Sequence, residues 1–476
     1  MSKKDQKSYA LEVSLIALVI AAAFVVQQFL NSGKPPSMPE SGQSGEMADT
    51  DQDDADGEGT KEPGDEGDGV SPQPKAVDEV PQKYNPALSD LGKTPDWSTL
   101  DVYQRSIKKE DFLRELRDVF TLRDEWKKWV TLKDDHVLIR THVNEDTSDK
   151  GAETVVAKKP LRYWRERSEI SNDLADFPLR GVKIVLDPGH IGGDYAEMEG
   201  RSLAYRETSP VQEGNLTLIV SELLKEQLEQ LGAEVDLTRG SNSPVNPHKV
   251  SDYFPYALSK LGEKENIALP QNKVKIAKAL CEKTFYRAGE IKARASLVND
   301  DLKPDLVVCI HFNASDWNKK DLEPAEHCHM ILNGAYTYGE LAKDNDRFTL
   351  VTKILQRVHN EEAALSASVA RAFTYHTGLP PYAYDPNSSR AVNVNKDPYL
   401  WARNLAANRQ FMCPVVYCEP YLMNGVDSHQ RILLGDYEGL RFVNGMLRPS
   451  IFREYVNSVT EGLVNYYSKR DKEDGK

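Results

Sequence analysis

The sequence predicts an α/β protein whose main domain is a mostly parallel sheet with helices on both faces. From Gly181 onward, short runs of β-branched and apolar residues alternate with longer segments in which apolar residues recur at helical spacing. The strand-like runs are apolar almost throughout, which is typical of parallel strands buried on both faces. We therefore expect an α/β domain over residues 181–470, with an insertion at 240–290, and three segments of different character before it.

The first segment, residues 1–30, has the pattern of a transmembrane helix. Residues 11–30 contain only four polar residues, and about 20 residues of helix span a bilayer core. Lys3, Lys4 and Lys7 precede this run and the chain after it is acidic, which places the N-terminus in the cytoplasm. We expect an uncleaved, single-pass anchor in the cytoplasmic membrane, with the rest of the chain in the periplasm or another extracytoplasmic space. A cleaved signal peptide is the alternative.

The second segment, residues 31–85, is dense in Asp, Glu, Gly, Ser and Pro and has few large apolar residues. Such a composition cannot bury enough apolar surface to offset the entropy of ordering the chain. We therefore expect a disordered acidic linker; an acidic tail that binds a partner is the alternative. The whole chain has a formal net charge of -14, which argues against a protein that binds nucleic acid through its phosphates.

The third segment, residues 86–180, predicts a small α+β module. Leu113, Leu116 and Val119 form an apolar stripe on a helix expected at 108–122, and strand-like runs follow at 129–143. No chemical motif occurs in it. It either positions the next domain or binds a partner.

The α/β domain then follows in order, as strands and helices that alternate. We expect strands at 182–187, 233–238, 305–312 and 327–332, and helices at 215–231 and 290–302. In open sheets of this kind, ligands bind at the carboxyl ends of the strands. His190 follows the first of these strands, in LDPGH, and His311 lies at the end of the third.

His190, His311 and Glu213 are the candidate metal ligands, since each lies at the end of an element on one expected edge of the sheet. Two histidines and one carboxylate, with a fourth position left for water, are the usual ligands of catalytic zinc. Glu197 and Glu207 are open alternatives to Glu213.

The remaining cysteines and histidines predict no second metal site. Five cysteines without CxxC pairs imply neither a zinc knuckle nor a disulfide framework, and Cys309 is expected to be a buried free thiol. His327 and His329 share one face of a strand. We expect them to be hydrogen-bonded within the domain, with a role next to the site or in substrate contact as the less favoured alternative.

Four blocks of the sequence stand out: VKIVLDPGHIGGD, QEGNLTLIVSELLKEQLEQLGAEVDLTR, ARASLVNDDLKPDLVVCIHFNAS and CPVVYCEPYLMNGVD. Together they resemble the zinc-dependent N-acetylmuramoyl-L-alanine amidases of the AmiC type, amidase family 3. Their order and spacing match the family over most of residues 181–467, whereas the N-terminal third is not covered. The resemblance implies that His190, Glu213 and His311 hold Zn²⁺ and that Glu419 is the catalytic acid–base group.

The resemblance also suggests supporting residues and shows two departures. Asp194 and Asn313 match positions near the family's site, and Arg294 matches a helix arginine without an assigned role. Ile191 stands where the family usually has glycine, so the loop after the first ligand is expected to be stiffer. The insertion is expected to form either an occluding element, through residues 252–261, or a wall of the substrate groove.

The activity implied by the resemblance is hydrolysis of the amide between N-acetylmuramic acid and L-alanine of peptidoglycan, in cell wall remodelling or daughter-cell separation. A catalytically silent wall-binding or amidase-regulating protein of the same fold is the first alternative. A zinc hydrolase that acts on another amide is the second. The expected partners are peptidoglycan and, through the anchor, the membrane, with no nucleic acid; a protein activator stays open.

Overall fold

The computed structural model describes residue 87 and residues 94–142, 149–154, 159–170, 177–264, 268–315, 321–385, 388 and 390–468. The predicted anchor at 1–30 and linker at 31–85 lie outside these residues. None of the helices within the described ranges combines the length and the apolar character that a membrane span requires.

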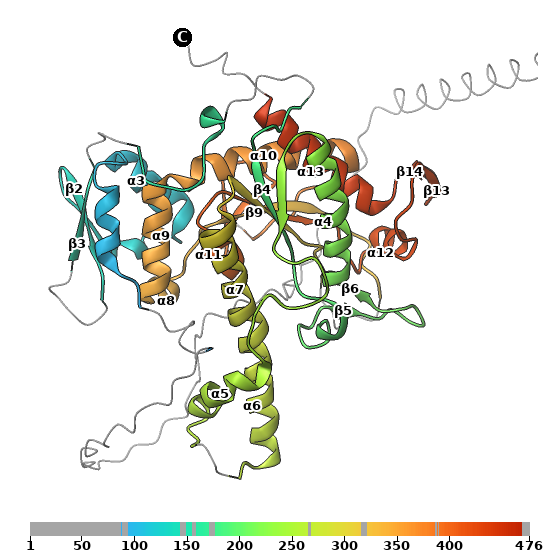
Figure 1. The fold of residues 1–476 in the computed structure, drawn as a ribbon, viewed down its shortest axis with the longest axis horizontal. Helices are drawn as coiled ribbons and strands as arrows, with labels where there is room; N and C mark the ends of the chain where they lie inside the picture. Colours follow the sequence, from blue (N-terminus) through green and yellow to red (C-terminus); the bar gives the residue numbers. More distant parts are fainter. Residues whose placement is uncertain are drawn as a thin grey trace, which may run out of the picture. The chain divides into compact units, whose positions relative to one another are not determined.

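The α/β domain is built on the largest sheet of the described chain, which has seven strands (Figure 1). Their order across the sheet is β10-β11-β9-β12-β8-β4-β7. In chain order they are β4 (Lys183–Pro188), β7 (Glu234–Leu237), β8 (Leu306–Ile310), β9 (Cys328–Asn333), β10 (Val392–Asn393), β11 (Leu400–Arg403) and β12 (Val415–Pro420).

Most neighbouring strands run parallel, which confirms the predicted class. The parallel pairs are β4 with β7, β4 with β8, β8 with β12, and β9 with β11. Strand β9 is antiparallel to β12, and β10 is antiparallel to β11. Strand β9 reverses because the chain enters it from the sheet edge at which β8 ends, without the crossover that a parallel connection needs.

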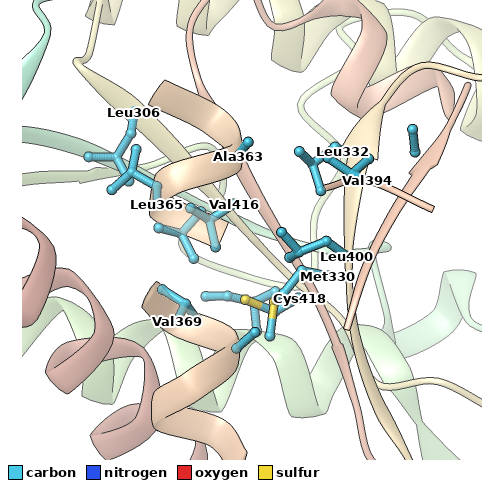
Figure 2. Close-up of a cluster of buried hydrophobic side chains, with 14 of the residues drawn as sticks. Leu306, Met330, Leu332, Ala363, Leu365, Val369, Val394, Leu400, Val416 and Cys418 are labelled. Carbon is cyan, nitrogen blue, oxygen red and sulfur yellow. The ribbon is translucent and has the colours of Figure 1, made fainter. Parts of the chain in front are cut away.

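Helices cover both faces of the sheet, because successive strand residues point to opposite sides. Ile184 and Leu186 pack in one cluster, with apolar residues of α4 (Glu213–Gln230), α10 (Val358–Thr377) and α13 (Ile451–Tyr467). Figure 2 shows part of this cluster, where side chains of α10 lie against the sheet. Val185 packs in a second cluster on the other face, with residues of α7 (Glu290–Ser296), of η8 (Leu297–Leu302) and beside α11 (Ala406–Gln410).

The segment before residue 180 packs onto the α/β domain through α9 (Asp344–Gln356). Trp97 stacks edge to face on Phe348, with 5.3 Å between ring centroids, and Arg347 donates to the carbonyl of Arg140 at 2.7 Å. The predicted helix at 108–122 is α3 (Lys109–Glu115), which continues as η2 (Leu116–Phe120). A small antiparallel sheet follows, made of β1 (Val130–Leu132), β2 (His136–Arg140) and β3 (Asp149–Glu153).

The insertion forms a helical projection, at the bottom of Figure 1. It consists of η6 (Val250–Tyr253), α5 (Phe254–Lys260), α6 (Gln271–Lys283) and η7 (Thr284–Gly289). Its small core contains Tyr253, Ala277 and Phe285, and two residues from elsewhere join it: Ile191 and Ala87.

The remaining helices and strands are short. They are η1 (Trp97–Tyr103), η3 (Glu125–Lys128), η4 (Arg167–Glu169), η5 (Gly193–Tyr195), β5 (Ser202–Leu203), β6 (Val211–Gln212), α8 (Tyr338–Leu341), α12 (Val426–Leu433), β13 (Arg441–Val443) and β14 (Met446–Arg448). All five cysteines are buried and free, as expected for a chain without a disulfide framework.

Candidate metal centre and active site

The three candidate ligands come together at the carboxyl edge of the sheet. His190 follows β4, His311 follows β8 and Glu213 begins α4. One ligand atom from each lies within 4.8 Å of the others. His190 Nε2 is 3.2 Å from Glu213 Oε2, and His311 Nδ1 is 3.1 Å from Glu213 Oε1.

This donor set fits a zinc ion, because two imidazoles and one carboxylate on rigid elements leave a coordination position for water. Glu197 and Glu207, the alternatives to Glu213, are exposed and lie outside the group. A side chain at Gly189 would not fit, since its Cβ would lie 2.3 Å from the His311 ring. The backbone of β4 therefore approaches His311 closely enough for the two histidines to share one carboxylate.

The charges in the group favour a cation. Burial alone would lower the pKa of His190, but the negative charge of Glu213 and a hydrogen bond to Glu199 raise it to about 9. Burial would raise the pKa of Glu213, but the charge and hydrogen bond of His190 and the hydrogen bond of His311 hold it well below its usual range. The group therefore stabilises positive charge, as a proton or as a metal ion.

Glu199, which the sequence analysis did not identify, orients the loop that carries His190. Its carboxylate accepts hydrogen bonds from the backbone N–H of Ile191 at 3.0 Å and of Gly192 at 3.2 Å, and lies 3.6 Å from His190 Nδ1. A carboxylate behind a ligating histidine fixes the ring and raises its basicity. His190 has φ 57°, a left-handed conformation that costs energy in a residue with a side chain, so these contacts stabilise a strained turn.

Arg201 is a second residue that the sequence analysis missed. Its Nε lies 3.2 Å from His190 Nε2 and 3.3 Å from Glu213 Oε2. A guanidinium is therefore placed against two of the candidate metal ligands.

Arg294, which had no assigned role, ties α7 to the end of β4. Its guanidinium donates to Asp187 Oδ1 at 3.0 Å, to Glu290 Oε1 at 2.8 Å and to the carbonyls of Pro188 and His190 at 2.7 and 2.8 Å. Burial would raise the pKa of Asp187, but the charge of Arg294 and a hydrogen bond from Thr238 lower it. Arg294 is thus a positioning residue for His190.

Replacing Arg294 by Met is expected to lower the free energy of unfolding by about 3–5 kcal/mol, because two buried carboxylates lose their partner. Arg114→Met is the control, since Arg114 is exposed and pairs with Asp111 at the surface, and it should cost about 0.5 kcal/mol or less. Urea unfolding followed by circular dichroism measures both changes. Equal costs for the two variants would contradict the role given to Arg294.

Glu419 lies on β12 and is buried. The backbone N–H of His311 donates to the carbonyl of Cys418 at 3.2 Å, so His311 and Glu419 are neighbours on adjacent strands. Tyr417, which shares a strand face with Glu419, stacks on the His311 ring with 4.5 Å between centroids and 12° between planes. The structure therefore brings the carboxylate of Glu419 to the same side of the sheet as the metal group.

His329, on β9, lies beside Glu419, and His327 comes just before that strand. The partner of Glu419 in the β9–β12 register is His329. The rings of His327 and His329 lie 4.6 and 5.0 Å from that of Tyr382, and Tyr384 Oη is 3.3 Å from His329 Nε2. Neither histidine belongs to the metal group.

The other predicted supporting residues lie at the edge of the site. Asp194 is exposed on η5. Asn313 accepts a hydrogen bond from the backbone N–H of Met423 through its carbonyl, at 2.8 Å, and so fixes the turn after β8 to the chain after β12.

A pocket opens onto the metal group, and the insertion forms part of its wall. His190, Glu199, Arg201 and His311 are among the residues that line it. Among the described residues that line it, those of the insertion are Tyr286, Arg287 and Glu290, and none comes from 252–261. Of the two expectations for the insertion, this arrangement favours a groove wall.

The part of the chain that carries the candidate ligands matches a known protein family. Residues 184–380 match the family described as N-acetylmuramoyl-L-alanine amidase. A search of curated proteins finds no significant match.

Similar solved structures are also amidases by their descriptions. The amidase Ami1 of Mycobacterium abscessus, in its apo form, is 18% identical, with 60% of this chain and 99% of that chain covered and a TM-score of 0.31. Ami1 of Mycobacterium smegmatis is 15% identical over 61% and 99%, with a TM-score of 0.33. CwlD of Clostridioides difficile, in complex with the GerS lipoprotein, is 14% identical over 60% and 99%, with a TM-score of 0.30. The residues that match this family include the three candidate ligands, most of β4 and all of β9.

Proposed function

We propose that this chain is a zinc-dependent peptidoglycan amidase that hydrolyses the amide between N-acetylmuramic acid and L-alanine of the stem peptide. The observation that carries the zinc dependence is the meeting of His190, Glu213 and His311 within 4.8 Å, inside the matched family domain. Cell wall remodelling or daughter-cell separation is the process that such a reaction serves.

In this proposal, His190, Glu213 and His311 hold the zinc ion. A zinc ion supplies Lewis acidity, which polarises a carbonyl and lowers the pKa of water. Glu199 keeps the His190 ring in place, and Arg294 holds the carbonyl of His190. Tyr417 packs on His311 and limits its rotation.

Glu419 moves the proton. Its carboxylate takes a proton from the attacking water, whose oxygen bonds to the lactyl carbonyl carbon, and delivers it to the nitrogen of the leaving L-alanine. The amide C–N bond then breaks, which leaves a carboxylate on the lactyl group and a free amine on L-alanine. The burial of Glu419 keeps bulk water away from its carboxylate during this transfer.

We expect Arg201→Gln to raise zinc affinity about fivefold or more, because a cation between His190 Nε2 and Glu213 Oε2 repels the guanidinium that contacts the same atoms. Competition with a chromophoric chelator measures the dissociation constant. Arg206→Gln is the control, since Arg206 is exposed on the same loop. A weaker affinity in Arg201→Gln would show that Arg201 organises the ligands instead of competing with the metal.

We also propose the location predicted from the sequence: a single-pass anchor at residues 11–30 in the cytoplasmic membrane, a cytoplasmic N-terminus, and a catalytic domain in the extracytoplasmic space. The charge pattern of residues 1–85 supports it. Cysteine-accessibility labelling of intact cells, at one engineered cysteine before residue 10 and one after residue 31, tests it. Labelling of the first site from outside would contradict the orientation.

The full chain, solubilised in a non-ionic detergent and loaded with zinc, should release stem peptides with a free L-alanine amino group from purified sacculi. Mass spectrometry identifies these products. A chelated sample is the control. Release from soluble muropeptides but not from sacculi would favour the alternative amide substrate, and no release from either would favour a silent wall-binding protein.

A further inference from the structure

The insertion carries charge of the opposite sign to the rest of the chain. Helix α6 contains four lysines and one glutamate, whereas the whole chain has a net charge of -14. Lys273 pairs with Glu263 on the inner side of the helix. Lys275, Lys278 and Lys283 are exposed, and the side chain of Lys278 is 75% exposed. We call these three lysines the α6 lysines.

The outer side of α6 is exposed, and on it Lys278 pairs with Glu282 of the same helix, at 3.5 Å between Nζ and Oε1. Ala277 and Cys281 face the core of the insertion, while Val274 and Ile276 are 45% and 48% exposed beside the α6 lysines. Lys275 and Lys278 are three residues apart and therefore lie on one face of the helix. A surface of this kind suits an anionic partner.

The most acidic segment of the sequence precedes a residue that packs beside α6. Ala87 is only 1% exposed and packs in the insertion core with Ala277 and Cys281 of α6. Residues 49–68, shortly before it, contain ten acidic residues and one lysine. The end of the acidic segment is thus tethered at the helix that carries the lysines.

We propose that residues 49–68 dock on the α6 lysines of the same chain. The connection from Asp68 to Ala87 can extend over about 60 Å, at roughly 3.3 Å per residue, whereas α6 is only about 20 Å long. Both ends of the helix are therefore within reach. Tethering also gives the acidic segment a high effective concentration, which a free anion would lack.

The docking surface on α6 is close in sequence to residues that line the pocket. Helix α6 continues directly into η7, which contributes Tyr286 and Arg287 to the pocket wall. Docking therefore places carboxylates at the start of this wall, where they contribute to the field that an approaching substrate meets.

Carbodiimide cross-linking of the full chain in non-ionic detergent tests the proposal, because it couples a carboxylate to a lysine only where the two are in contact. At 50 mM NaCl, mass spectrometry should find cross-links from residues 49–68 to the α6 lysines at least about fivefold more often than to Lys127 and Lys159, whose side chains are 58% and 79% exposed. At 500 mM NaCl, where the Debye length is only about 4 Å, the excess should disappear.

Two further measurements distinguish docking of the acidic segment of the same chain from docking of a second copy and from no docking. Mixing unlabelled and nitrogen-15-labelled chains before cross-linking should give products within one isotope only; mixed products would overturn the proposal in favour of a second copy. Replacing the ten acidic residues by Asn and Gln should speed hydrogen exchange over residues 271–289 several-fold. Unchanged exchange, or cross-links spread evenly over all exposed lysines, would overturn docking altogether.

Discussion

Replacing Glu419 by Gln is expected to lower kcat on sacculi by about 10²–10⁴-fold while leaving the zinc content unchanged. The amide of Gln fills the same space but cannot take a proton from the attacking water. Glu419 is buried on β12, beside the candidate metal ligand His311, so no exposed carboxylate can replace it at the same position. Release of stem peptides, measured per zinc-loaded chain, gives the ratio of rates.

Glu207→Gln is the matched control for this change. Glu207 is exposed on the loop between β5 and β6, outside the metal group. We expect its activity to stay within about twofold of the unmodified chain. If Glu419→Gln kept most of its activity, the proton transfer would have to be assigned to another group, with His329 as the next candidate because it is the cross-strand partner of Glu419.

Replacing His311 by Ala should abolish both stoichiometric zinc binding and hydrolysis. The substitution removes one of three ligands and leaves Glu213 without the imidazole that contacts its Oε1. Loss of a ligand typically reduces metal affinity far more than the 10–100-fold expected for residues behind the ligands. Atomic absorption after gel filtration measures the zinc content independently of activity.

His327→Ala tests whether this loss is specific. His327 and His311 are equally buried, each 6% exposed, but His327 lies outside the metal group. It should retain zinc at about one equivalent per chain and most of the activity. Zinc loss in both variants would mean that His311 acts through the fold and not as a ligand.

The three candidate ligands could be predicted because each lies at the end or the start of a regular element. His190 and His311 end strands whose apolar runs are visible in the sequence, and Glu213 begins a helix with clear periodicity. Parallel strands end at one edge, so these residues had to approach one another. The reversed direction of β9 could not be predicted. The periodicity of apolar residues predicts a strand but does not tell in which direction it runs in the sheet.

Glu199 and Arg201 could not be predicted, because they lie on a loop without periodicity between Gly193 and Gln212. Their roles depend on where that loop folds back against His190. The role of Arg294 depends on the packing of α7 against the end of β4, which is a tertiary contact. Hydrogen bonds to backbone carbonyls leave no pattern in the sequence. The burial of one face of a helix, in contrast, is visible as apolar residues at regular spacing.

The position of Ile191 makes the insertion inseparable from the catalytic loop. Ile191 is fully buried in the insertion core with Tyr253 and Phe285, one residue after the candidate ligand His190. Glu290, at the end of the insertion, also shares Arg294 with Asp187. Excising residues 244–290 would therefore expose an isoleucine beside the candidate metal ligand and remove one partner of Arg294. The insertion is thus not an independent unit: transferring it to another protein of this fold would require Ile191 and Arg294 to be transferred with it.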